Sequence, residues 1–484
     1  MSNKIPLMLT SGCLSLLIAC LVGCGEDTAP GGAGAPNYTP TTTGAAQYTP
    51  TATGAASNTT TATPTSTTDV GISGASFTLN GTPWIPKAFN ISGFVSTPAY
   101  LQSQTRSPAK YNGWVADTNC GPALFAAIKG WGADTVRFLV SQYFLNLSLN
   151  PPPSPPPAYY DPQYFANACS IIHQAREAGL VVEIAMQDEP ESGGPMFHGL
   201  PTSETLDNWL ALDREFGTDR GVMYELYNEP QQEPPGTHTP GTPTPAPTCS
   251  AGLTSPPVPS QADWALWLNG GPAYYPPKYT ESFTAIGMQP IITALRMNGA
   301  TNTFVLDGLA LATTLNGIPT VSDPTLNRIG YGIHQYLQGG TVGPCDWELN
   351  FGNQSESLPI FVDEWFACEN TKPGLAGLDS YQPAVDFLNY LREKGIGIGG
   401  WAIDTPGYMV NDIPANPNTN PSACNMGWQH PSYYAGFPSA PIGDAGMLII
   451  NDFLAGYGRP LTLTDGMTLY NQPPPDYPAI DCST

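Results

Sequence analysis

The pattern of apolar and polar positions divides the chain into three parts. An apolar run from Leu14 to Val22 comes first, and residues 25–69 then carry Thr, Ala, Gly and Pro with almost no large aliphatic side chains. From about residue 70, short apolar runs alternate with amphipathic segments. A hydrophobic core can therefore form only in the third part of the chain.

Eight apolar runs in this third part have the length and composition of buried strands. They lie at 84–89, 135–140, 181–186, 223–227, 303–306, 330–334, 360–363 and 398–402. Helical patterns separate them at 121–130, 164–178, 203–216, 287–297, 384–394 and 444–455. Strands that alternate with helices in this way predict an α/β fold, a (β/α)8 or TIM barrel. A doubly wound sheet is the alternative, but no glycine-rich phosphate-binding loop supports it.

Three long proline-rich loops, 147–163, 230–279 and 405–440, each follow the carboxyl end of a predicted strand. Barrels place their active sites at this face, so we expect the loops to line a substrate cleft. A role as surface decoration is the alternative for each loop taken singly.

Charge narrows the class of partner. The chain has 39 acidic against 16 basic residues and a formal net charge of −23. Such a surface disfavours nucleic acids and anionic lipid headgroups, and it favours a neutral partner such as a polysaccharide.

The amino terminus has the features of an export signal. The sequence Leu21-Val22-Gly23-Cys24 closes the first apolar run and resembles the lipobox of bacterial lipoproteins. That resemblance implies a signal peptide over 1–23 and a lipid on Cys24. The composition predicts a disordered tether over 24–69, followed by the barrel domain over 70–484. An ordinary secretory signal is the alternative, and either one predicts an extracytoplasmic protein.

Ten cysteines are present, and removal of the signal and lipidation of Cys24 would leave seven. In an oxidising compartment we expect disulfides rather than metal sites, since no CxxC pair occurs. Seven is odd, so one thiol should be unpaired. Cys345 and Cys368 follow neighbouring predicted strands and are the expected pair.

Two predicted strands end in acids. The run Val222–Pro230 delivers Glu229 just before a proline, which cannot continue a strand ladder. The run Leu358–Trp365 delivers Glu364 in the same way. Two carboxylates at the carboxyl ends of barrel strands are typical of the acid pair of a glycosidase.

The motif Asn228-Glu229-Pro230 resembles the signature of clan A glycoside hydrolases, specifically family 5, the cellulase family. The resemblance extends over about residues 75–457. It includes, in the expected order, Arg137 on the second strand, His334 and Tyr336 on the sixth, Glu364 on the seventh and Trp401 on the eighth.

The resemblance implies a role for each residue. Glu229 would be the general acid and base and Glu364 the nucleophile, with retention and a carboxylate separation of about 5–5.5 Å. Asn228 would bind the sugar 2-hydroxyl, and Arg137 would keep Glu364 ionised and oriented. A purely structural ion pair is the alternative for Arg137.

On the sixth strand, His334 and Tyr336 are two residues apart and should face the same side. Tyr336 would donate to Glu364, and His334 would contact a sugar hydroxyl. Trp401 would stack on a pyranose ring, or else simply pack in the core. Two further acids lie on the strands that carry Glu229 and Glu364. On the fourth strand, we expect Glu225 to be a hydrogen-bonded barrel residue below the site. We expect Asp363, whose strand parity is opposite to that of Glu364, to point toward the helices or a loop.

One position departs from the family. Many relatives carry a histidine at the end of the third strand, where this chain reads Met186-Gln187-Asp188. Gln187 or Asp188 would take that role, or His198 would reach in from the following loop. Seven loop aromatics would bind sugar at outer subsites or fix the loops to the barrel: Trp114, Tyr159, Tyr160, Trp264, Trp267, Tyr274 and Tyr275.

These observations predict a retaining glycosidase of β-linked polysaccharide, first an endo-β-1,4-glucanase and second a β-mannanase or another β-glycanase. A transglycosylase and a non-catalytic surface carbohydrate-binding protein are the alternatives. We expect a monomer that needs no cofactor and no metal, because the loop histidines lack metal-ligand spacing. His173, within a helical pattern, should lie at the surface.

Overall fold

A computed structural model describes residues 67–93, 121–150, 152, 156, 160–188, 198–231, 259–275, 281–337, 343–367, 381–404, 409, 445–455, 459–461 and 465. All of them belong to one unit, Pro64–Thr484. Residues 24–66 of the predicted tether, Trp114, Tyr159, Cys368 and the side chain of Cys345 lie outside the described residues. The end of the predicted tether is described, and Asp69 pairs there with Arg220 and Arg328. Cys169 is a free, buried cysteine. In the part of the chain that is described, no helix is long and apolar enough to cross a membrane.

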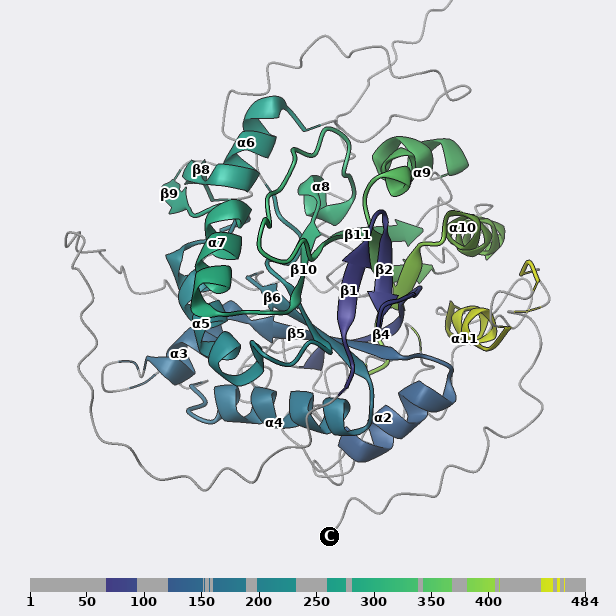
Figure 1. The fold of residues 1–484 in the computed structure, drawn as a ribbon, viewed down its shortest axis with the longest axis horizontal. Coiled ribbons are helices and arrows are strands. Elements are labelled where there is room, and N and C mark those ends of the chain that lie inside the picture. Colours follow the sequence, from purple (N-terminus) through teal and green to yellow (C-terminus); the bar gives the residue numbers. More distant parts are fainter. Residues whose placement is uncertain are drawn as a thin grey trace, which may run out of the picture. The chain divides into compact units, whose positions relative to one another are not determined.

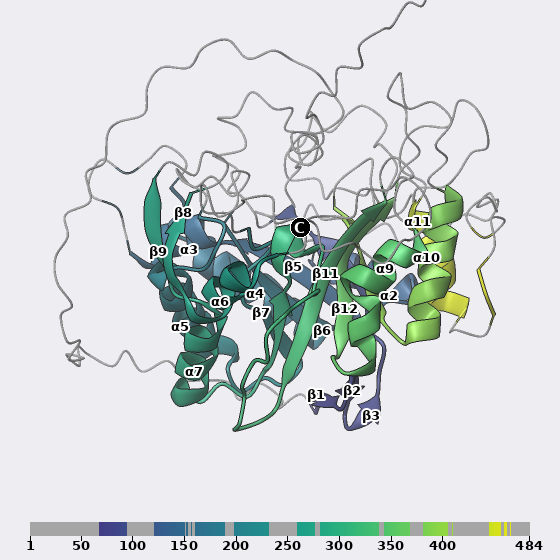
Figure 2. The same cartoon turned by 90° about the horizontal axis from the view of Figure 1, so that it is seen from above.

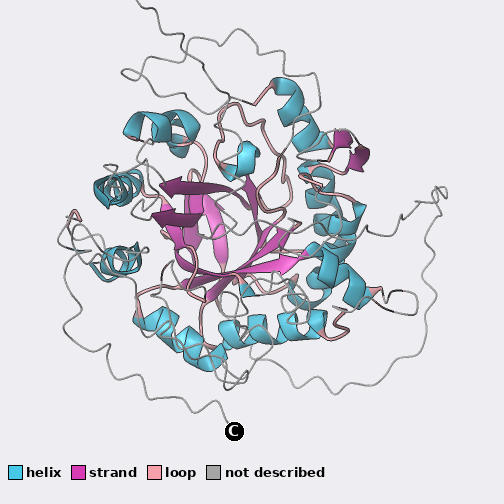
Figure 3. Cartoon of the chain, turned by 180° about the vertical axis from the view of Figure 1, so that it is seen from behind, coloured by secondary structure: helices cyan, strands magenta, loops and turns pink. Residues whose placement is uncertain are grey.

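The centre of the unit is a closed barrel of eight parallel strands, which confirms the predicted (β/α)8 architecture. In order around the barrel the strands are β4 (Lys87–Ile91), β5 (Thr135–Ser141), β6 (Val181–Gln187), β7 (Val222–Glu225), β10 (Thr303–Asp307), β11 (Ile329–Leu337), β12 (Ile360–Ala367) and β13 (Gly397–Gly400). Figures 1 and 3 show these strands in the middle of a ring of helices. All eight predicted runs form strands, with ends that differ by a few residues.

The helices cover the outside of the barrel. They are α2 (Gly121–Gly130), α3 (Gln142–Leu149), α4 (Tyr164–Glu177), α5 (Ser203–Phe216), α6 (Gln261–Asn269), α7 (Met288–Asn298), the short α8 (Leu309–Ala312), α9 (Pro344–Asn350) with the 3-10 turn Gly352–Glu356, α10 (Tyr381–Lys394) and α11 (Ala445–Ala455). The six predicted helices are confirmed. His173 on α4 is partly exposed and pairs with Glu215, as expected of a surface residue.

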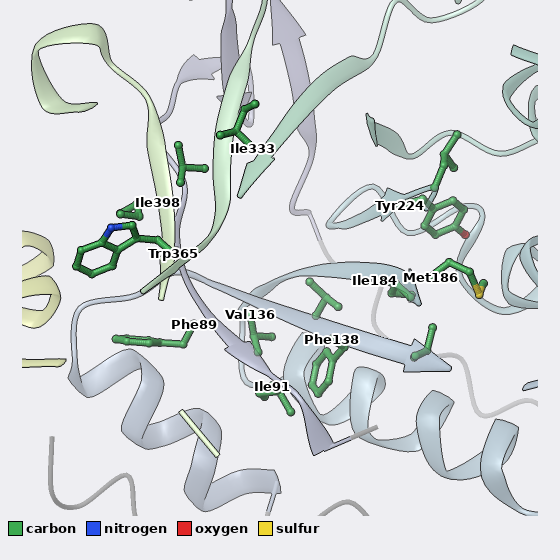
Figure 4. Packing of buried hydrophobic residues seen from close by; sticks show 14 of the residues in the cluster. Phe89, Ile91, Val136, Phe138, Ile184, Met186, Tyr224, Ile333, Trp365 and Ile398 are labelled. Carbon is green, nitrogen blue, oxygen red and sulfur yellow. The ribbon is translucent and has the colours of Figure 1, made fainter. Parts of the chain in front are cut away.

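Alternate residues of each strand face these helices because side chains on a strand have a period of two. Figure 4 shows Phe89, Val136, Phe138 and Ile184 pointing from the strands into the layer between strands and helices. All four are fully buried in the main hydrophobic cluster. The other residues of each strand face the barrel interior.

A small sheet closes the amino-terminal end of the barrel. It consists of β1 (Val70–Ser73), β2 (Ser76–Leu79) and β3 (Thr82–Pro83), and Figure 2 shows it at one end of the barrel. Val70 and Phe77 from this sheet cluster with the first inward-facing strand residues: Ala88, Val181, Met223, Val305 and Phe361. We call these seven residues the apolar layer. A Cβ at Gly330 would lie 2.3 Å from the Phe77 ring, so glycine is required there.

The second inward-facing residue of the same strands is polar. Asn90, Arg137, Glu183, Glu225, Asp307 and Asp363 are all fully buried, and we call them the polar layer. At the carboxyl-terminal end above it, the hairpin of β8 (Gly271–Tyr274) and β9 (Ser282–Ala285) belongs to the long loop after β7. The polar layer thus separates the packed bottom of the barrel from its functional face.

Candidate active site

Glu229 lies just beyond β7, in the chain turn that follows the strand. Its backbone has a φ of +49°, in the left-handed region that non-glycine residues rarely adopt. The Glu229 N–H donates to Asp307 Oδ2 at 2.9 Å, and the Asn228 N–H donates to the Met186 carbonyl at 2.9 Å. Neighbouring strands β6 and β10 therefore fix the direction in which the acid projects. Residues in such strained conformations concentrate at functional sites.

Arg137, from β5, connects the polar layer to the site. Its guanidinium makes a two-pronged contact with Glu225, Nε to Oε2 at 2.5 Å and Nη2 to Oε1 at 2.7 Å. Nη1 also donates to Asn90 Oδ1 at 2.7 Å and to Glu364 Oε2 at 2.9 Å, and Nη2 donates to Asn228 Oδ1 at 2.6 Å. Glu225 is thus a hydrogen-bonded barrel residue, as expected, and Arg137 contacts Glu364 directly.

Glu364 enters the barrel interior through an irregularity in β12. The strand register shifts between Val362 and Trp365 on one side, and between Gly332 and His334 on the other. The Tyr336 hydroxyl donates to Glu364 Oε1, opposite the Arg137 contact on Oε2. Burial raises the pKa of Glu364, while the charge of Arg137 and the Tyr336 hydrogen bond act against that rise.

The prediction for Asp363 is wrong. It shares its parity with inward-facing Phe361, and one of its oxygens lies 3.4 Å from His334 Nε2 inside the barrel. Simple alternation would then turn Glu364 outward, but the register shift brings both consecutive acids to the interior. A bulge of this kind depends on strand pairing and cannot be seen in one strand's sequence.

His334, from β11, lies between the two predicted catalytic acids. Nδ1 is 2.9 Å from Glu229 Oε1 and 3.4 Å from Glu364 Oε2. Nε2 faces Asp307 and Asp363, both at 3.4 Å. Burial and the nearby Arg137 lower the pKa of His334 well below its usual value, which favours the neutral ring. A neutral ring with Nδ1 protonated donates to Glu229.

The spacing of the two acids defines what the site can do. Carboxylate oxygens of Glu229 and Glu364, together with a ring nitrogen of His334, all lie within 4.8 Å of one another. Both acids are almost fully buried, with exposed fractions of 5% and 2%. A close carboxylate pair in a low-dielectric setting suits acid–base and nucleophilic chemistry.

Trp401 follows β13 and is half-buried. Its N–H donates to the Trp365 carbonyl at 2.8 Å, and the Trp401–Ala402 peptide bond is cis. The ring packs against the main hydrophobic cluster while part of it stays accessible. Trp401 can therefore combine packing with a sugar contact.

The end of β6 departs from the sequence expectation in one respect. Asp188 Oδ2 lies 2.6 Å from His198 Nδ1 and 3.3 Å from the Tyr227 hydroxyl. Asp188 and His198, which the sequence offered as alternatives at this position, therefore form one ion pair. Tyr275 and Phe283, at and beside the hairpin strands, both pack on the His198 ring with centroids 5.1 Å away. Burial lowers the pKa of His198, but the hydrogen bond and the charge of Asp188 more than offset this effect, and the pKa is raised above its usual value.

Gln187 is buried beside this pair, and its Oε1 has no hydrogen-bond partner among the described residues.

The loop aromatics divide into two groups. Trp264 and Trp267 on α6 are buried, and their indole N–H groups bond the Asn316 and Asp307 carbonyls, so they fix the long loop to the barrel. Tyr160, Tyr274 and Tyr275 are half-buried.

Sequence reasoning missed Asn90, Glu183 and Asp307. Each is a polar residue inside or directly after a predicted apolar strand, which is the signal that could have identified it. Asp307 is the clearest case, because it ends β10 at the same face as Glu229. Two groups could hold a cation by their donor atoms: Glu225, Asp307, His334 and Asp363, and separately Glu229, His334 and Glu364.

Comparison with known proteins shows the family of the chain. Residues 89–407 match the cellulase family, glycosyl hydrolase family 5, and the chain therefore belongs to that family of O-glycosyl hydrolases. No curated protein matched the chain.

One solved structure that resembles the chain is a thermostable, halotolerant family 5 cellulase from an Icelandic hot spring isolate, with 16% identity over 82% of this chain and 97% of that one, and a TM-score of 0.45. Another is the catalytic domain of a Thermobifida fusca endoglucanase, with 13% identity over 80% and 97%, and a TM-score of 0.45. A third is the catalytic domain of a Streptomyces sp. SirexAA-E mannanase, with 16% identity over 72% and 84%, and a TM-score of 0.42.

Proposed function

We propose that this family 5 enzyme is a retaining β-glycanase that works by double displacement, with Glu229 as acid and base and Glu364 as nucleophile. The observation that carries the proposal is the close approach of the two carboxylates, within 4.8 Å. Retaining glycosidases have carboxyl groups about 5–5.5 Å apart, whereas inverting ones need about 6.5–9.5 Å to admit a water. The spacing supports the retaining mechanism.

In the first step, Glu364 Oε attacks the anomeric carbon while Glu229 gives its proton to the leaving glycosidic oxygen. Arg137 and Tyr336 each bond one oxygen of Glu364, and so orient the nucleophile and stabilise its charge. In the second step, ionised Glu229 takes a proton from water, which attacks the glycosyl–Glu364 ester. The N–H of His334 would stabilise Glu229 while it is ionised.

We propose a β-1,4-glucan as the first substrate and β-mannan as the second. The acidic chain favours a neutral polymer, and half-buried Trp401 offers a ring face for a pyranose. Asn228 would contact the 2-hydroxyl of the cleaved sugar. The sugar site would also be lined by Gln187, whose buried Oε1 has no hydrogen-bond partner among the described residues. Asp188 and His198, which bond each other, would contribute to the same site.

The test is reducing-sugar release from carboxymethyl cellulose, mixed-linkage glucan, glucomannan, xylan and β-1,3-glucan. Glu229→Gln should lower kcat by about 100- to 10,000-fold because general acid catalysis is lost. Glu215→Gln makes the same change on the surface and should leave activity unaltered. Sugar binding without release from any polymer would reject hydrolysis and favour a carbohydrate-binding protein, and longer oligosaccharide products would favour a transglycosylase.

The nucleophile has its own test. Glu364→Ala should lose turnover of aryl β-glycosides, and azide should restore it with an inverted glycosyl azide as product. Azide enters the space left by the carboxylate and attacks the anomeric carbon from that face while the bond to the aryl leaving group breaks, so this single displacement inverts the anomeric configuration. Unchanged activity of Glu364→Ala would contradict the assignment.

For the amino-terminal region we propose a lipid anchor on Cys24 and a tether that displaces the catalytic domain from an extracytoplasmic membrane surface. The support is the sequence pattern that ends at Cys24. Cys24→Ala should move the protein from the membrane fraction to the soluble fraction, and membrane retention of the variant would reject the anchor.

A further inference from the structure

The polar layer beneath the site contains more acids than cations. Glu183, Glu225, Asp307 and Asp363 come from four different strands and are all fully buried. Among the described residues of this layer, Arg137 is the one permanently charged cation, and both oxygens of Glu225 are already bonded to it. Glu183 lies 4.0 Å from the Arg137 Nε, so it shares this cation with Glu225, and Asp307 and Asp363 therefore need another means of charge compensation.

Asp307 and Asp363 share an arrangement that the catalytic steps do not use. Each accepts one backbone hydrogen bond: Asp307 Oδ2 from the Glu229 N–H at 2.9 Å, and Asp363 Oδ1 from the Ile333 N–H at 3.1 Å. The second oxygen of each, Asp307 Oδ1 and Asp363 Oδ2, is buried with no hydrogen-bond partner among the described residues.

Both of these unpartnered oxygens point at the same place. A Cβ added to Gly332 would lie 2.1 Å from Asp307 Oδ1 and 2.4 Å from Asp363 Oδ2. Glycine at 332 thus makes room for two carboxyl oxygens, which both occupy the space that a side chain at this position would take. Two ionised carboxylates in such a position repel one another in a low-dielectric interior.

We propose that Asp307 and Asp363 form a carboxylic acid–carboxylate pair, carrying one proton and one negative charge, that positions Glu229 and His334 for the reaction. The proton resides on one of the two oxygens beside Gly332 and points at the other. The oxygens that accept the Glu229 and Ile333 N–H groups stay unprotonated. The inference rests on the proposed function of Glu229 but concerns residues outside the catalytic acids.

A cation is the competing explanation, since Glu225, Asp307, His334 and Asp363 are within 4.8 Å of one another. However, Glu225 is bonded to Arg137 through both oxygens, and His334 Nε2 lies 3.4 Å from Arg137 Nη2. A metal ion bound to all four groups would lie close to the guanidinium and compete with its contacts. A proton satisfies the two free oxygens without that cost.

The groups that face the pair also favour a bound proton. Glu225 and Glu183 add negative charge from β7 and β6, Glu364 lies above, and Arg137 alone opposes them. Burial first, and then the neighbouring acids, raise the pKa of both Asp307 and Asp363 well above the ordinary range.

The pair acts on catalysis through the backbone. Asp307 fixes the N–H of Glu229 in its left-handed conformation, and Asp363 fixes the N–H of the residue before His334. Glu229 and His334 bond each other at 2.9 Å above the pair. The pair therefore ties the ends of β7 and β11 together and sets the approach of Glu229 to Glu364.

Substitutions at each position separate the shared-proton arrangement from simple loss of a contact. In Asp307→Asn or Asp363→Asn, the amide carbonyl still accepts the backbone N–H, and the NH2 group donates to the partner carboxylate. Each should keep kcat within about threefold of wild type. Asp307→Ala and Asp363→Ala remove the acceptor and should lower kcat by about 100-fold with little change in KM, as expected for a misplaced catalytic group.

The control is Asp323→Ala, which removes a buried acid bonded to Arg296 at 3.0 Å, away from the site. It should lower the melting temperature while the kcat of the folded protein stays unchanged. Asn variants that lose as much kcat as the Ala variants would overturn the proposal, and they remain informative if an Ala variant fails to fold.

Infrared difference spectroscopy measures the proton without reference to activity. At neutral pH the wild-type spectrum should contain the C=O band of one protonated carboxyl group from this pair. That band should be absent from the spectrum of Asp307→Asn, and the same band should be absent from the spectrum of Asp363→Asn. An unchanged band in both, or one equivalent of metal in the purified wild type that either variant lacks, would overturn the proposal. If the wild type degrades no glycan while the band behaves as expected, the proposed function fails and the pair stands.

Discussion

The apolar and polar layers of the barrel occupy equivalent positions two residues apart on the same strands. Ala88, Val181, Met223, Val305 and Phe361 are followed by Asn90, Glu183, Glu225, Asp307 and Asp363. A glycine of β11 makes room for side chains of each layer: Gly330 for the Phe77 ring, and Gly332 for Asp307 and Asp363. The two layers therefore have equivalent backbone positions but opposite side-chain chemistry.

The energetic consequences of the two layers differ. In the apolar layer, the Phe77 and Phe361 rings meet edge to face at 6.4 Å, and burial of each stabilises the fold by about 1.5–3 kcal/mol. In the polar layer, both oxygens of Glu183 and one each of Asp307 and Asp363 have no hydrogen-bond partner among the described residues. Each such group costs about 1–3 kcal/mol, and more than that if it stays ionised. The difference shows that the apolar layer at the closed end stabilises this barrel, and that this stability offsets the cost of the buried polar groups at the functional end.

Arg137→Met tests the polar layer most severely. It leaves Glu225 and Glu364 without their guanidinium, and breaking a buried ion pair in this way should destabilise the protein by about 3–5 kcal/mol. Activity should also be lost, because Glu364 loses a hydrogen-bond donor. Denaturant unfolding gives the stability, with Arg137→Lys as the variant that keeps charge but not the planar fork. A fully stable Arg137→Met protein would mean that the layer is neutral throughout.

Phe361→Leu tests the apolar layer. The smaller side chain leaves a partial cavity against Phe77, and we expect a loss of about 1–2 kcal/mol in unfolding free energy. The kcat of the folded enzyme should not change, since Asp363 and Glu364 keep their backbone positions. A drop in kcat larger than threefold would show that the two layers are coupled rather than separate.

Glu183→Gln should have the smallest effect and the most informative sign. Burial and the charge of Glu225 raise the folded-state pKa of Glu183 above its ordinary value of 4.5. The unfolded chain releases this proton first, so wild-type stability should fall as pH rises from about 4.5 through the folded-state pKa. Glutamine cannot titrate, and we expect the variant to be about 0.5–1 kcal/mol more stable than wild type at neutral pH.

At pH 4 the difference between wild type and Glu183→Gln should shrink, because the carboxyl group is then protonated in both folded and unfolded states. Thermal melts of both proteins across this pH range provide the measurement. A wild type that becomes relatively more stable as pH rises would show that Glu183 is ionised and compensated in the fold.

The sequence by itself determined the barrel, because strand and helix periodicities are local and each of the eight apolar runs satisfies one of them. It also singled out Glu229 and Glu364 as candidate acids near the carboxyl ends of two strands, although β7 already ends at Glu225 and β12 continues to Ala367. Arg137 was identifiable only through its place in a family pattern, and its main partner Glu225 only through the closed barrel.

Tertiary structure decided the remaining features. Whether Asp363 faces inward depends on a register shift between β12 and its two neighbours, which no single strand's alternation records. Likewise, Asp188 and His198, which are ten residues apart, form an ion pair only in the folded chain, and Asp307 accepts the Glu229 N–H from the neighbouring strand β10. Period-two patterning assigns residues to faces of a strand, but contacts between strand ends arise only when the barrel closes.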